Sequence, residues 1–202
     1  MRHIWRGFAV SAVIALGAHV SFSNTAHAAC EAGKPGNALT GGEAQAVYDC
    51  LEEDLAAGYA KGDKRWIPAE YVRDYRSWTS ASTFPAAPGF HGERFLLTFV
   101  NPVGAEQYLK YEDEGVTMPA GTVIAKESFS VNDQGKASPG PLFLMEKAPA
   151  GASPQTNDWY YMMVAPSGQP QAVPVAQACH ACHAGFEGSD GLGYPVEEAR
   201  VK

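Results

Sequence analysis

The sequence is poor in positive charge, and it contains no internal repeat and no low-complexity segment. Its 202 residues include 15 lysines and arginines against 22 aspartates and glutamates, and the formal net charge at pH 7 is −7. Because an acidic protein repels phosphate groups, nucleic acid and anionic membrane are not expected as partners. A chain of this length suits one domain with a substantial hydrophobic core.

The first 28 residues have the pattern of a secretory signal peptide. Arg2 and Arg6 give this segment a positive start, residues 7–20 are mainly apolar, and residues 26–28 fit a cleavage site with small residues at both ends. The apolar run is too short for a stable membrane span. The sequence therefore predicts export to the periplasm without a membrane anchor. Cleavage would remove Arg2 and Arg6 and make the mature protein more acidic.

Cysteine is scarce, with 4 residues in the whole chain. In an oxidising compartment, Cys30 and Cys50 are expected to pair with each other. Such a bridge would close a loop of about 20 residues and stabilise the fold by about 3 kcal/mol, as expected from the chain entropy of the unfolded state. The other two cysteines, Cys179 and Cys182, belong to a separate motif.

This motif is Cys-His-Ala-Cys-His at residues 179–183, which has the C-x-x-C-H spacing of a c-type haem attachment site. Two thiols at this spacing can each form a thioether with one vinyl group of a porphyrin. His183 follows the second cysteine directly and is then placed to supply the proximal nitrogen ligand of the iron. The sequence thus predicts one covalently attached haem c, held by Cys179, Cys182 and His183.

Two other interpretations of the motif stay open at this point. Cysteine and histidine also bind zinc, although most structural zinc sites have a second ligand pair that is separated from the first. A pair of redox-active thiols is the other alternative. Such a pair usually opens a helix within a βαβ unit, and no such unit is apparent around residues 179–183.

Hydrophobic periodicity indicates helices first, then a group of short strands, then one more helix. Thr40 and Glu43 form a capping box at the start of the first helix. The expected helices cover residues 40–61, 68–78, 102–111 and 173–185, and the expected strands cover residues 94–100, 121–131, 142–148 and 159–164. Local connections between strands favour an antiparallel sheet. The predicted fold class is therefore α+β, with flanking helices and a C-terminal haem-attachment helix.

Several segments resemble the cytochrome P-460 family, which includes cytochrome c′-β. These segments are residues 94–101, Tyr108, and residues 119–127, 157–161 and 179–183, in the same order as in the family. The resemblance implies an antiparallel sheet of about five strands, a homodimer, and one haem c with an open sixth position on the iron. It divides the chain into a signal peptide (1–28), an N-terminal helical segment (29–90) and a haem domain (91–202).

The resemblance also assigns roles to individual residues. Lys126 matches the lysine that is joined covalently to the porphyrin edge in cytochrome P-460, an enzyme that oxidises hydroxylamine. Such a bond would relieve the cost of burying an ammonium group and would distort the haem. The enzymes also carry a glutamate base after the third strand. Glu146 is the only acid in that interval before Asp158, at a position that also suits a solvent-exposed strand end.

The function expected from this resemblance is hydroxylamine oxidation at the haem iron, with electrons passed to a periplasmic redox protein. One alternative is a nitric oxide binding or scavenging protein of the c′-β type. The other is a simple electron-transfer cytochrome, in which a methionine or His91 fills the sixth position. His91 follows a Pro-Gly loop, where an ordinary surface histidine is the more common occurrence. The candidate methionines are Met118, Met145, Met162 and Met163.

Overall fold

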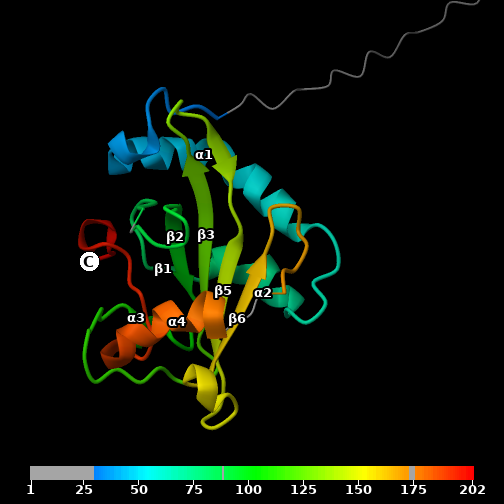
Figure 1. Cartoon of the computed structure of the whole chain (residues 1–202), viewed down its shortest axis with the longest axis vertical. Helices are drawn as coiled ribbons and strands as arrows, with labels where there is room; N and C mark the ends of the chain where they lie inside the picture. Colours follow the sequence, from blue (N-terminus) through cyan, green and yellow to red (C-terminus); the bar gives the residue numbers. More distant parts are fainter. Residues whose placement is uncertain (1–29, 88, 173–175) are drawn as a thin grey trace, which may run out of the picture.

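The structure is a computed structural model that describes residues 30–87, 89–172 and 176–202. The expected signal peptide lies outside these residues. Strands of the described chain form a 6-stranded antiparallel sheet in the order β1-β2-β3-β5-β6, with β4 paired to β3. Helices surround the sheet (Figure 1), so the predicted α+β class is confirmed. The strands are β1 (Thr79–Ser80), β2 (Phe95–Val100), β3 (Val123–Val131), β4 (Ala137–Pro139), β5 (Leu142–Lys147) and β6 (Trp159–Val164).

The four strands expected from the sequence correspond to β2, β3, β5 and β6. The additional strands β1 and β4 are 2 and 3 residues long. A segment this short shows no alternation of apolar and polar residues that could reveal it. β4 also ends on Pro139, a residue that sequence rules place in turns or at sheet edges.

The first helix, α1 (Gly41–Ala60), begins at the predicted capping box. The backbone N–H of Glu43 donates to Oγ1 of Thr40 at 3.4 Å, and the Glu43 carboxylate accepts from the backbone N–H of Thr40 at 2.8 Å. Cys50 of α1 forms a disulfide with Cys30, as predicted. The bridge attaches the beginning of the described chain to the first helix.

The remaining helices are shorter than expected. They are α2 (Ala69–Asp74), followed by a 3-10 turn (Tyr75–Ser77), then α3 (Ala105–Tyr108) and α4 (Ala181–His183). The expected helix over 173–185 is irregular: a π-helical turn (Ala176–His180) precedes α4, a 3-10 segment (Ala184–Ser189) follows it, and residues 173–175 lie outside the described residues. Gly185 and Gly188 disfavour continuation of the α-helix, because glycine loses more backbone entropy than other residues when it is fixed in a helix.

The two faces of the sheet have different surroundings. On one face, Leu51 and Leu55 of α1 pack with Phe129 of β3 and Leu144 of β5 in the larger hydrophobic core. Figure 1 shows α1 crossing the sheet near one end of β3, whereas α4 lies near the other end. The N-terminal helical segment therefore shares a core with the strands that follow it. Among the described residues, no helix has both the length and the apolar character needed to cross a membrane.

A buried ion pair fixes the helix layer to β3. The Glu127 side chain is 1% exposed, accepts a hydrogen bond from the Tyr48 hydroxyl at 2.9 Å and pairs with the guanidinium of Arg76. Burial raises the pKa of Glu127, an effect that Arg76 opposes. Because successive residues of a strand point to opposite faces, the anchoring of Glu127 towards α1 directs Lys126 to the other face.

Candidate haem-binding site

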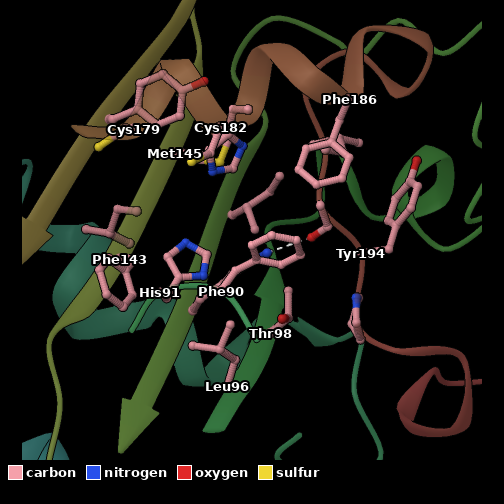
Figure 2. A pocket seen from close by; sticks show the side chains of 18 of the residues that line it. Phe90, His91, Leu96, Thr98, Phe143, Met145, Cys179, Cys182, Phe186 and Tyr194 are labelled. Atoms are coloured by element: carbon pink, nitrogen blue, oxygen red, sulfur yellow. Dashed lines mark hydrogen bonds between the residues drawn. The ribbon is translucent and has the colours of Figure 1, made fainter. Parts of the chain in front are cut away.

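A cavity of about 600 Å³ lies against the face of the sheet that is turned away from α1. Its wall is mainly apolar and includes Phe90, Leu96, Ile124, Phe143, Met145, Phe186 and Tyr194. Figure 2 shows Cys179 and Cys182 at one side of the cavity, with His91 and Phe143 across from them. The predicted attachment motif therefore opens onto a space with the size and polarity typical of a cofactor pocket.

His183 lies in the wall of this cavity and is 7% exposed. Its Nδ1 donates a hydrogen bond to the carbonyl oxygen of Gly191 at 2.7 Å, so Nε2 keeps a free lone pair. Burial lowers the pKa of His183 to about 4, and the ring is therefore in the neutral form that a metal ligand requires. Cys179 and Cys182 are free thiols and line the same cavity.

A second buried ion pair supports the backbone that His183 contacts. The Asp190 carboxylate accepts from Nζ of Lys147 at 2.7 Å and from Nδ2 of Asn157 at 2.9 Å. Asp190 adopts a left-handed backbone conformation with a φ of 58°, which turns the chain into Gly191. Nothing in the linear sequence links Asp190 to Lys147, 43 positions earlier, so only the folded chain reveals this pair.

Lys126 projects into the cavity from the centre of β3. Its residue exposure is 8%, and Nζ donates to the carbonyl oxygen of Gly193 at 2.6 Å. Burial lowers the pKa of Lys126 to about 8, so a sizeable part of the amine is neutral in mildly alkaline solution. The inward orientation that the family resemblance requires is therefore present, on the same cavity as His183.

Glu146 does not share this cavity. It belongs to the same face of β5 as Leu142 and Leu144, which pack in the core beneath α1. Together with Trp66 and Tyr160 it lines a different groove of about 610 Å³. The sheet therefore separates the Glu146 carboxylate from Lys126 and from the cavity that holds His183.

His91 lines the cavity and is half-buried. Its ring centre is 4.7 Å from the ring centre of Phe143 and 6.3 Å from that of His183. Burial, assisted by the nearby charge of Lys126, lowers the pKa of His91 to about 3. Its Nδ1 is buried and has no hydrogen-bond partner among the described residues. The sequence identifies His91 as a possible iron ligand, but the Pro-Gly loop before it favours an exposed position.

The residues around the cavity fit a haem. The wall is mainly apolar, the two thiols line it, and Nδ1 of His183 carries the proton, which leaves the lone pair on Nε2. The buried, unpartnered Nδ1 of His91 is a further sign that the cavity holds a polar group in the working protein. An α+β fold of this kind, with histidine, thiols and a buried lysine around one apolar cavity, defines a haem cytochrome.

The comparison with protein families agrees with this class. A model of the family Cytochrome P460 matches residues 72–192, which is more than half of the chain. The chain therefore belongs to the cytochrome P460 family. The match begins within α2, so it includes part of the N-terminal helical segment. No curated protein matches the chain.

Proposed function

We propose that the protein is an exported c-type cytochrome that oxidises hydroxylamine in the cavity beside His183. The observation that carries this proposal is the burial of Lys126 in the same cavity as the attachment motif. If Lys126 were directed towards solvent, the site would support haem binding but would give no reason to propose hydroxylamine oxidation. The inward lysine instead matches the residue that distinguishes the hydroxylamine-oxidising members of the family.

The chain supplies the attachment points for this group. Cys179 and Cys182 would form the two thioethers, and Nε2 of His183 would bind the iron. Arg200, at the cavity wall beside Tyr194, is available to pair with the carboxylates of the porphyrin. When bound, haem supplies a metal centre that can accept electrons from a small substrate and pass them on one at a time.

Lys126 would fix and distort the porphyrin edge through a covalent bond from Nζ. This bond would replace one N–H and one C–H bond, so an external two-electron oxidant must take up the two electrons while two protons are released. Burial lowers the pKa of this amine to about 8 and so favours the neutral form that can bond to carbon. Hydroxylamine oxidation also releases protons. With Glu146 on the other face of the sheet, the carboxylate at the rim of the cavity is Asp113. Asp113 is exposed and can pass protons directly to water.

The test is the ferrous absorption spectrum of protein matured with covalent haem. We expect a strongly red-shifted Soret band that disappears in Lys126→Met and persists in the control Lys136→Met, which changes an exposed lysine. Hydroxylamine should reduce an artificial electron acceptor in the presence of the wild-type protein, and Lys126→Met should abolish this turnover. A wild-type protein with an ordinary c-type spectrum and no turnover would refute the proposal.

The apolar interior favours a second candidate function, the binding of nitric oxide. Phe143 and Met145 line the cavity, and the predicted glutamate base is absent from the described part of its wall. Tight nitric oxide binding without hydroxylamine turnover would support this candidate. In either case we propose a homodimer that exchanges electrons with a periplasmic redox protein.

A further inference from the structure

We propose that His91 is a sixth ligand of the haem iron and closes the distal position in the resting protein. The centres of the His91 and His183 rings are 6.3 Å apart. If one metal ion binds both rings from opposite sides, the distance between the ring centres is the sum of two metal–nitrogen bonds of about 2 Å and two distances of about 1 Å from nitrogen to ring centre, which gives roughly 6 Å. The ring planes are inclined by 57°, which is compatible with ligation because the rings need share only the axis through the metal.

The surroundings of His91 place it opposite the attachment motif. Figure 2 shows His91 across the cavity from Cys179 and Cys182, and His183, the residue that follows these cysteines, lies in the wall of the same cavity. Phe143 packs against the His91 ring at 4.7 Å and restricts its orientation. His91 and His183 therefore line one cavity, with their ring centres 6.3 Å apart.

Two properties of His91 have no explanation in a purely structural role. Its Nδ1 is buried and finds no hydrogen-bond partner among the described residues. Its backbone is left-handed, with φ 56°, as is that of Glu93, with φ 58°. Non-glycine residues are uncommon in this region, and such strain persists where a functional group must be held in place. Ligation through Nδ1 would explain both the backbone geometry and the unpartnered nitrogen.

Two of the candidate methionines, Met118 and Met145, are less suitable ligands. Met145 is 7% exposed and packs with Ile124 and Trp159 in the smaller hydrophobic core, where a thioether fills space. Met118 belongs to the same core.

Ligation by His91 replaces the expected open position with a closed one. A small molecule must then displace the imidazole, and the short loop that carries His91 supplies the movement. Gly89 and Gly92 flank this residue and both have positive φ, so the loop has backbone freedom on both sides. The inference rests on haem attachment through His183, and it holds whether the displacing molecule is hydroxylamine or nitric oxide.

The experiment uses ferric holoprotein and compares electron paramagnetic resonance and absorption spectra. We expect the wild type to be low-spin with two nitrogen ligands. His91→Gly should become high-spin, and added imidazole should restore the low-spin signal. Glycine suits the positive φ at this position, so the variant should keep its fold. The control Glu93→Ala changes an exposed residue of the same loop and should leave the spectra unchanged.

A functional measurement completes the test. If His91 occupies the position in about nine of ten ferrous molecules, its removal should raise the apparent affinity for carbon monoxide about tenfold. A high-spin wild-type protein would overturn the inference, as would an unchanged low-spin spectrum in His91→Gly. Loss of hydroxylamine turnover alone would not, because turnover tests the proposed function and the spin state tests the ligand.

Discussion

Removal of the Asp190 carboxylate should cost the protein a large part of its stability. Asp190 and Lys147 have side-chain exposures of 6% and 11%, and Asp190→Ala leaves the Lys147 ammonium without its counter-charge. The loss of one partner from a buried ion pair usually costs about 3–5 kcal/mol. Lys147 keeps a hydrogen bond to the carbonyl oxygen of Asn157 at 2.9 Å and a position 5.2 Å from the ring of Trp159. We therefore expect the lower end, about 3 kcal/mol.

The assay is guanidinium unfolding of holoprotein followed by far-UV circular dichroism. The midpoint should fall while the slope stays constant, because the surface exposed on unfolding hardly changes. Asparagine adopts the left-handed backbone readily and keeps a hydrogen-bond acceptor, so Asp190→Asn should lose about half as much free energy of unfolding as Asp190→Ala. Asp74→Ala removes an exposed partner of Arg73 and should have little effect. A loss below about 0.5 kcal/mol for Asp190→Ala would refute the reasoning.

Three further predictions concern stability. Replacing both Cys30 and Cys50 by serine should lower the free energy of unfolding by about 3 kcal/mol, measured by the same denaturation. Arg76→Met leaves the buried carboxylate of Glu127 without a counter-charge and should lower the free energy of unfolding by about 3–5 kcal/mol. Restored stability in the double variant that also carries Glu127→Gln would confirm this cause. The hydrogen bond from Lys34 lowers the pKa of Glu43 from 4.5 to about 2. The stability contributed by Glu43 is present above pH 4.5 and lost as the pH falls towards 2, so Glu43→Gln should flatten the stability profile in that window.

Local patterns were enough for much of the fold. The alternation of residues along residues 121–131 predicted β3, and the capping box at Thr40 predicted where α1 begins. Both signals depend on neighbours within four residues. The short strands β1 and β4 depend on pairing with distant segments, and the irregular helix at the attachment motif depends on glycines and on packing. These features were therefore missed or simplified.

By itself, the sequence determined the attachment motif and the disulfide partners, because each follows from the spacing or the number of a few reactive side chains. Only the tertiary structure decided which side of the sheet each functional group occupies. Lys126 and Glu146 are both strand residues, and alternation says only that a strand has two faces. The packing of α1 against one face assigns Glu146 to the core side and Lys126 to the cavity. The position of His91 depends on loop backbone angles, which no periodic pattern encodes.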